Sequence, residues 1–224
     1  MIKLLVTKVL PDEVLDLFPK LYYHVESRNF IIIEFLSFSK KPALNKRIIF
    51  SSQNAVEGFI HNFDATDLKD KKLYVVGDHT AVALQALGGK VSVQRNNAKE
   101  LAEILEDPND DEPYDWFCST ISLDDLPKVF RRKGFVLNSY KIYRTKLMPQ
   151  TLSSSYDGIL FFSPSAVEAF FQTNMLGSQT KLFTIGKTTA KALATHTNQS
   201  AAFPKVPKVK NLLMLVKDDF DAEK

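Results

Sequence analysis

The sequence predicts an α/β fold of two similar domains, each a parallel sheet flanked by helices, with a two-stranded connector and a cleft between them. The first observation is an internal repeat, in which IIFSSQNAVEGFI at residues 48–60 corresponds to ILFFSPSAVEAFF at residues 159–171. The second observation is a further shared phrase after each copy, LYVVGDHTAVAL at 73–84 and LFTIGKTTAKAL at 182–193. A repeated unit of this length is a domain, because solenoid repeats have periods of about 20–50 residues.

Each copy of the repeat begins with a strand, a short turn and a helix. Residues 48–50 and 159–162 are apolar runs bounded by turn residues, which is typical of strands covered on both faces. In the segment after the first run, Ala55, Val56, Phe59 and Ile60 share one helical face. Serine or asparagine precedes each helix and is a favourable N-cap residue, so the strand–turn–helix interpretation holds for both copies.

The second shared phrase also predicts a strand followed by a helix in each copy. Residues 73–76 and 182–185 are expected strands, each ending at a glycine, and helices follow both. Gly88 and Gly89 end the first of these helices. Since strands alternate with helices throughout, both sheets are expected to be parallel with helices on both faces.

The first copy extends beyond the repeat. We expect a strand at 91–93, a helix at 98–105, an acidic loop at 106–115 and a strand at 114–119, followed by a helix and strand over 129–140. The second copy stops about 30 residues after its second glycine, so a sheet built from it alone lacks strands.

Strand counting therefore predicts that one domain is discontinuous. The N-terminal apolar segment 2–7 belongs to neither copy and supplies a strand to the C-terminal half. We expect residues 1–34 with 147–224 as one domain and 40–139 as the other. The connectors are then 35–39 and 140–146, because the extended segments 30–38 and 139–147 have an alternating pattern suited to a two-stranded ribbon.

Composition restricts the function classes. The 224-residue chain has a formal net charge of +3, too small to indicate nucleic acid but compatible with an anionic small molecule. Its single cysteine, Cys118, excludes an internal disulfide framework and a cysteine-cluster metal site, and the four histidines lack ligand spacing. No run approaches the roughly 20 apolar residues of a membrane span, and the first apolar stretch is too short for a secretory signal. We expect a cytoplasmic monomer without metal.

Five phrases in order give the chain a resemblance to the uroporphyrinogen-III synthase family. They are Leu5–Lys8, Phe50–Val56, Val76–Ala81, Ile142–Thr145, and Phe162–Ser165 followed by Ile185–Ala190. The resemblance implies two α/β domains, one discontinuous, a cleft active site and no organic cofactor. It also implies hydroxymethylbilane as substrate, uroporphyrinogen III as product, and the upstream deaminase as a transient partner.

Two departures from the family pattern concern substrate contacts. Members commonly have Thr-Arg where this chain has Thr7 and Lys8, and lysine lacks the bidentate fork that arginine offers to a carboxylate. The loop at 120–122 is Thr-Ile-Ser, whereas many bacterial members have glycine or arginine there.

The substrate implied by the resemblance carries eight carboxylates, and helix N-termini supply unpaired N–H donors and a positive dipole end for such groups. The repeat places four helix N-termini at the carboxyl ends of strands, where parallel sheets bind ligands. A purely structural capping role, worth about 1 kcal/mol each, is the alternative for the hydroxyl residues. The expected substrate-binding residues are Thr7, Lys8, Ser52, Asn54, Gly77, Thr80, Ser163, Ser165, Gly186, Thr188 and Thr189.

By the same resemblance, Tyr143 is the catalytic candidate. The reaction removes the hydroxyl of ring A as water, so a proton donor near that ring is useful, and a phenol can serve. The alternative for Tyr143 is a ribbon tyrosine that packs on a domain face. Two alternatives for the whole protein stay open: a non-catalytic two-domain protein that binds a small anionic ligand, and a synthase-like protein that has lost activity.

Overall fold

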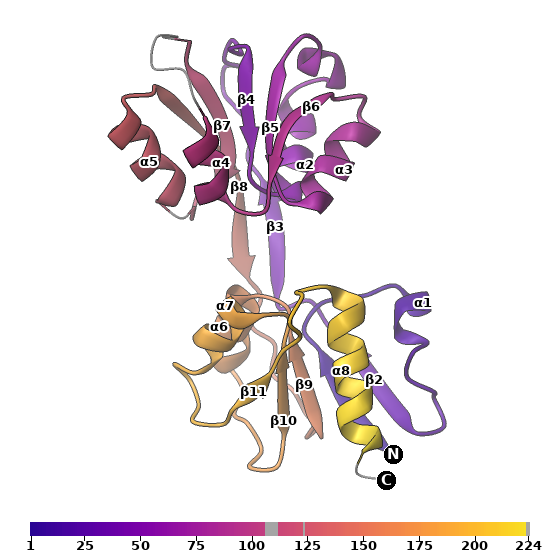
Figure 1. The fold of residues 1–224 in the computed structure, drawn as a ribbon. Coiled ribbons are helices and arrows are strands. Elements are labelled where there is room, and N and C mark those ends of the chain that lie inside the picture. The colour runs from indigo at the N-terminus through magenta and orange to yellow at the C-terminus, as the bar shows by residue number, and fades with distance from the viewer. Residues whose placement is uncertain (106–111, 123, 223–224) are drawn as a thin grey trace. The chain divides into compact units, whose positions relative to one another are not determined.

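The chain forms two compact units in the computed structural model, which describes residues 1–105, 112–122 and 124–222 (Figure 1). Unit 1 combines Met1–Ile32 with Lys146–Lys224, and unit 2 is Ile33–Thr145. None of the helices in the described part of the chain combines the length and apolar character that a membrane span requires. Most of the acidic loop expected at 106–115, namely residues 106–111, lies outside the described residues.

Unit 1 contains a five-stranded parallel sheet in the order β11-β10-β9-β1-β2. Its strands are β1 (Ile2–Val6), β2 (Tyr23–Ser27), β9 (Gly158–Phe161), β10 (Lys181–Thr184) and β11 (Ala201–Ala202). Its helices are α1 (Asp12–Leu15), α6 (Pro164–Phe171), α7 (Lys187–Leu193) and α8 (Val209–Asp221).

Two cores cover the two faces of this sheet. Leu4 and Val6 of β1 pack with the apolar side of α8, whereas Leu5 between them packs with α6 and α7. This alternation follows from the strand geometry, in which successive side chains point to opposite faces. Burying each such side chain contributes roughly 1.5–3 kcal/mol, so both faces stabilise the unit.

Unit 2 contains a six-stranded sheet in the order β3-β8-β7-β4-β5-β6, in which β4 to β8 are parallel. Its strands are β3 (Ile31–Phe35), β4 (Arg47–Phe50), β5 (Lys72–Val76), β6 (Val91–Arg95), β7 (Tyr114–Ser119) and β8 (Leu137–Leu147). Its helices are α2 (Gln53–Asn62), the 3₁₀ turn η1 (Ala65–Leu68), α3 (Asp78–Ala86), α4 (Ala98–Ile104) and α5 (Asp125–Lys133).

The central strand β4 is buried along its whole length, as the apolar run predicted. Ile48 and Phe50 join the core beneath α2 and α3, while Ile49 joins the core beneath α4 and α5. At the amino end of the sheet the fully buried carboxylate of Asp115 accepts hydrogen bonds from the backbone N and side-chain Nδ2 of Asn45, both at 2.7 Å. Because Asn45 precedes β4 and Asp115 belongs to β7, these bonds hold the segment before β4 against β7.

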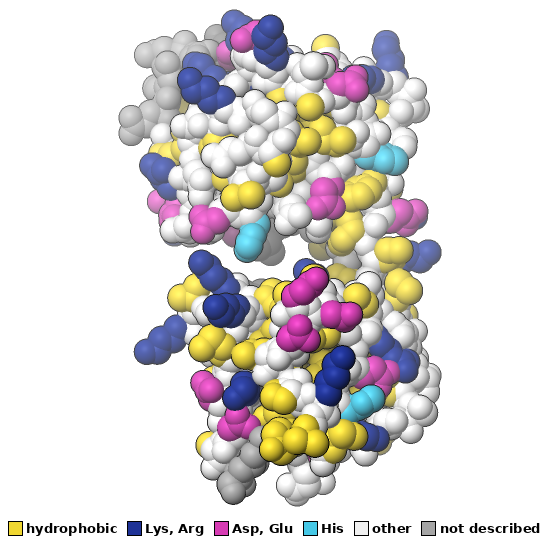
Figure 2. Space-filling model, turned by 90° about the vertical axis from the view of Figure 1, so that its right-hand side faces the viewer, with side chains coloured by type: hydrophobic (Ala, Val, Ile, Leu, Met, Phe, Trp, Pro, Cys, Tyr) yellow, Lys and Arg dark blue, Asp and Glu magenta, His cyan; other side chains and the backbone are white. Residues whose placement is uncertain are grey.

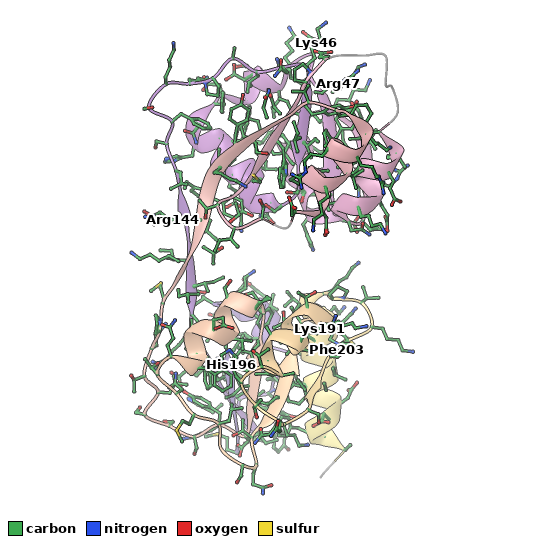
Figure 3. All side chains as sticks on the ribbon, turned by 90° about the vertical axis from the view of Figure 1, so that its left-hand side faces the viewer. Lys46, Arg47, Arg144, Lys191, His196 and Phe203 are labelled. Atoms are coloured by element: carbon green, nitrogen blue, oxygen red, sulfur yellow. The ribbon has the colours of Figure 1, made fainter. Side chains whose placement is uncertain are left out.

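Strands β3 and β8 are neighbours and pair as an antiparallel ribbon. The backbone N of Leu36 donates to the carbonyl of Ile142 at 2.9 Å, and the N of Met148 donates to the carbonyl of Phe30 at 2.8 Å. Arg144 on β8 extends to the side (Figure 3), and its guanidinium donates to Glu34 of β3 at 2.8 and 3.0 Å. Both strands contain a boundary between the two units.

Four elements of unit 1 were not predicted from the sequence: the two short ones α1 and β11, and the longer β2 and α8. The segment of β2, YHVES, mixes polar and apolar residues because it is an edge strand that pairs only with β1. The apolar positions of α8, which include Leu212, Val216 and Phe220, do have helical spacing. The short repeat copy suggested that strands were missing and left this segment without an assignment.

Candidate active site

The strand order of unit 2 contains a topological switch point. The chain runs from β4 outward to β5 and β6, then returns to the other side of β4 to form β7 and β8. In doubly wound sheets ligands bind outside the carboxyl ends of the strands at such a point. A pocket of about 430 Å³ lies there, lined by Ser51 and Ser52 after β4, Trp116 and Ser119 of β7, and Tyr143 of β8.

Tyr143 and Ser52, both expected site residues, meet in this pocket. The Tyr143 phenol oxygen lies 3.0 Å from Oγ of Ser52, which also accepts a hydrogen bond from the N–H of Ala55 at 3.1 Å and so caps α2. The capping bond fixes the position of the serine hydroxyl, and that hydroxyl in turn orients the phenol. Ser52 therefore has two roles: it caps α2 and it positions the hydroxyl of Tyr143 in the pocket.

Tyr143 is suited to hold a proton in this pocket. Its side chain is 9% exposed, and burial raises the pKa of its phenol above the ordinary tyrosine value. The hydrogen bonds with Ser52 and Ser119 oppose this shift, and the neighbouring Cys118 adds to it. Because the net pKa is raised, the phenol is protonated throughout the neutral range and can act as a donor.

Residues in and beside the wall of the pocket were not expected from the sequence: Trp116 lines it, and Lys141 lies against Trp116. The indole Nε1 of Trp116 donates to Oγ of Ser51 at 3.0 Å. Nζ of Lys141 donates to Oγ of Ser122 at 2.7 Å and lies 5.3 Å from the centre of the Trp116 ring. The sequence held a signal for both residues, because Trp116 lies within an expected strand and Lys141 precedes Tyr143 by two residues, a spacing that predicts the same face of a regular strand.

Unit 1 has a second pocket, of about 440 Å³, at the carboxyl ends of β10 and β11. It contains three expected residues, Gly186, Thr188 and Thr189, together with Lys187. The segment after β11 supplies its other wall, which includes Phe203 (Figure 3) and Lys205. Neither lysine has an ion-pair partner among the residues that the structure describes, so both positive charges are available to an anion.

Two further expected hydroxyl residues, Ser163 and Thr7, make structural hydrogen bonds. Ser163 caps α6 by accepting from the N–H of Ala166 at 3.1 Å. The hydroxyl of Thr7, 1% exposed, donates to the carbonyl of Leu160 at 2.9 Å and accepts from the N–H of Phe162 at 3.3 Å. Thr7 therefore joins β1 to β9, and a substrate contact through its hydroxyl requires breaking those bonds.

Four other expected residues lie near these turns without lining either pocket. Thr80 is 3% exposed inside α3, Asn54 and Ser165 are partly exposed in the first turns of α2 and α6, and Lys8 is exposed beyond β1. Their assignment as substrate-binding residues stays a prediction.

The turn at Gly77 is less suited to anions than the other three. Gly77 has a φ of 84°, a conformation that favours glycine, and it precedes α3. The first helical residue is Asp78, and its carboxylate accepts a hydrogen bond from Gln94 Nε2 at 2.8 Å. A carboxylate already occupies the positive end of this helix, so an anionic ligand is disfavoured there.

Charged side chains of both signs lie on the surface, and the described residues contain no group that could hold a metal ion. Basic and acidic side chains are interspersed on both units over the face drawn in Figure 2. In the described part of the chain, no three histidine, cysteine, aspartate or glutamate side chains are grouped so that they could hold a metal ion. Two doubly wound units, each with a pocket at the carboxyl ends of its strands, define the class as a two-domain α/β protein.

Comparison with known proteins identifies the family. A family model described as uroporphyrinogen-III synthase HemD matches residues 35–214. Because this span is most of the chain, the protein belongs to the uroporphyrinogen-III synthase family. It is thus a cyclising lyase of tetrapyrrole synthesis, and nothing supports the alternative of a non-catalytic binding protein.

Solved structures show the same fold. A uroporphyrinogen-III synthetase from Helicobacter pylori 26695 has a TM-score of 0.72 at 18% identity, with 97% of this chain and 99% of that chain covered. A mutant uroporphyrinogen III synthase from Thermus thermophilus has a TM-score of 0.67 at 14% identity, with 99% and 100% covered. The wild-type Thermus protein in another crystal form has a TM-score of 0.53 at 15% identity, with 100% and 99% covered.

Proposed function

We propose that the protein converts hydroxymethylbilane to uroporphyrinogen III at the unit 2 pocket, with Tyr143 as the proton donor. The observation that carries this proposal is the buried, protonated phenol held at 3.0 Å by Ser52 at the topological switch point of the sheet. A positioned side chain that transfers a proton to a leaving group typically contributes about 10²–10⁴-fold to a rate.

The proposed sequence of steps begins with water loss. Tyr143 gives its proton to the hydroxyl on ring A, the carbon–oxygen bond breaks, and the pyrrole nitrogen supplies the electron pair that forms an azafulvenium ion. The substituted carbon of ring D attacks this ion to form a spiro intermediate. The bond between that carbon of ring D and the methylene bridge to ring C then breaks, which leaves an azafulvenium ion on ring C. The unsubstituted α-carbon of ring D attacks this second ion, and the proton that this carbon loses restores the phenol.

The substrate is intrinsically reactive, so the main task of the protein is orientation. Free bilane closes without inversion and gives the symmetric I isomer, whereas a bound bilane held in one conformation can form the spiro intermediate. Trp116 and Ser51 form a fixed wall beside Tyr143 through their 3.0 Å hydrogen bond. In unit 1, Gly186, Thr188 and Thr189 offer donors to the substrate carboxylates, beside two lysines.

The cellular setting follows from the substrate. Hydroxymethylbilane closes spontaneously, so we expect a transient encounter with the upstream deaminase that produces it. We also expect a cytoplasmic monomer. A single species near 25 kDa in sedimentation at micromolar concentration is the expected result, and a stable dimer would contradict it.

A coupled assay tests the proposed function. Hydroxymethylbilane is generated in situ with a deaminase, this protein is added, and the products are oxidised and separated as porphyrin isomers. Predominant isomer III at catalytic concentrations of protein is the expected result. Isomer I alone, as in the control without protein, would refute the synthase activity and favour a synthase-like protein that has lost catalysis.

A further inference from the structure

Lys141 is a charged residue beside the unit 2 pocket that the reaction steps do not use, and it contacts two of the residues that line the pocket. It lies two residues before Tyr143 on β8, and its Nζ donates to Oγ of Ser122 at 2.7 Å. The same ammonium lies over the ring of Trp116, 5.3 Å from its centre. Both Ser122 and Trp116 line the pocket, so the positive charge is placed at its wall.

Among the described residues, no carboxylate forms an ion pair with this ammonium. Lys141 has no ion-pair partner within the ranges that the structure describes. The charged residues that line the pocket itself are Lys99, which lies 3.9 Å from Glu103, and Asp125. The pocket wall that contains the proton donor thus lies next to an ammonium that has no carboxylate partner in the described part of the chain.

The surroundings of Lys141 position its charge. An ammonium has three N–H donors, and Ser122 accepts one of them. The indole face attracts the cation, and the indole is itself fixed by its hydrogen bond to Ser51. A lysine held between a hydroxyl and an aromatic ring loses less side-chain entropy on binding than a freely rotating surface lysine.

We propose that Lys141 is a specificity-determining residue that binds one carboxylate of the substrate against Trp116, close to Tyr143. The assignment of this carboxylate to the bilane depends on the proposed function, since that substrate carries acetate and propionate on every ring. The ammonium supplies a charge-assisted hydrogen bond, which is roughly twice as strong as a neutral one. Its contact orients the ring next to the proton donor rather than taking part in the chemistry.

Trp116 makes this proposal directly measurable, because it is the single tryptophan of the chain. The probe is 1,2,3,4-butanetetracarboxylate, which has no chromophore, titrated into the protein while tryptophan fluorescence is followed. Calorimetry of the same titration supplies a readout that does not depend on the indole. The variants are Lys141→Met, Lys141→Arg and a control, Lys72→Met, which removes an equal charge at the exposed amino end of β5.

The expected result is saturable binding to the wild-type protein that Lys141→Met weakens by about tenfold or more, as loss of one charge-assisted hydrogen bond requires. Lys141→Arg retains most of the affinity, and Lys72→Met changes it by less than about twofold because salt screens a distant surface charge. In the coupled assay Lys141→Met raises the KM for hydroxymethylbilane and leaves kcat within about twofold, as expected for a binding contact.

Equal losses in Lys141→Met and Lys72→Met, or no saturable binding to the wild type, would overturn the proposal. Isomer III production with unchanged KM in Lys141→Met would also overturn it, while the synthase function stands. If the wild type makes no isomer III and Lys141→Met still loses affinity for the tetracarboxylate, the carboxylate site is supported and the synthase function fails.

Discussion

Replacing Tyr143 with phenylalanine isolates the proposed proton donor from the fold. The substitution removes one hydroxyl and keeps the ring, which packs in the core beneath α2. Ser52 loses its 3.0 Å partner but keeps the N–H of Ala55 at 3.1 Å, so no buried group is left without a hydrogen bond. The expected loss of unfolding free energy is therefore only about 0.5–1.5 kcal/mol, the net value of one hydrogen bond.

The catalytic effect should be much larger. A general acid contributes about 10²–10⁴-fold, and part of that is replaced by solvent because the substrate ionises readily, so we expect turnover to fall by more than tenfold. The coupled isomer assay gives kcat and KM, and chemical denaturation gives the stability. The share of isomer I should rise as the enzymatic reaction slows relative to spontaneous closure.

A second tyrosine of the same strand provides the matched control. Tyr140 packs against Phe117 at 5.2 Å and Phe38 at 5.9 Å between ring centres, and it does not line the pocket. Tyr140→Phe should therefore keep kcat within about twofold, because its hydroxyl is remote from the reacting groups. Near-normal turnover in Tyr143→Phe, or equal losses in both variants, would refute the role of Tyr143 as proton donor.

Three further predictions concern binding, packing and pH. Thr189→Ala, at the unit 1 pocket, should raise KM with little change in kcat; unchanged values of both would exclude a binding role. Asp115→Ala should lower the unfolding free energy by about 3 kcal/mol or more in chemical denaturation, since both amides of Asn45 lose their acceptor; a loss below about 1 kcal/mol would contradict this. Burial raises the pKa of Tyr114 and Tyr156 to about 12, with Tyr74 and Glu26 respectively adding to the shift. Their stabilisation is complete below about pH 10 and is lost as pH rises toward 12, so Tm should fall over that range. A Tm that stays constant between about pH 10 and 12 would refute the raised pKa of these two tyrosines in the folded protein.

The repeat was informative because it encodes interactions between residues close in the chain. An apolar strand, a serine and a helix follow one another in both copies, and the structure shows Ser52 and Ser163 each accepting from an N–H three residues ahead at 3.1 Å. A capping bond of this kind depends on local geometry and needs no knowledge of the rest of the molecule. The strands and helices after each cap follow for the same reason.

The expected site was less complete, because pocket walls are made by residues far apart in sequence. Trp116 lines the pocket with Ser52 because β7 lies beside β4, and Lys141 contacts Trp116 because β8 lies beside β7. Strand order is a long-range property, and the repeat did not specify it. The charge at Lys141 could be assigned to the pocket only after β8 was placed next to β7.

The sequence by itself determined the α/β class, the duplicated strand–turn–helix units and the family resemblance, since each depends on local patterns of apolar, capping and turn residues. Only the tertiary structure decided what individual hydroxyls do. Thr7 and Ser52 look equivalent in sequence, as hydroxyl residues at strand ends. Thr7 is fixed by a carbonyl 153 residues away, whereas Ser52 faces a pocket with Tyr143, 91 residues away. Such partners are set by sheet pairing, which brings together segments whose contact no local pattern records.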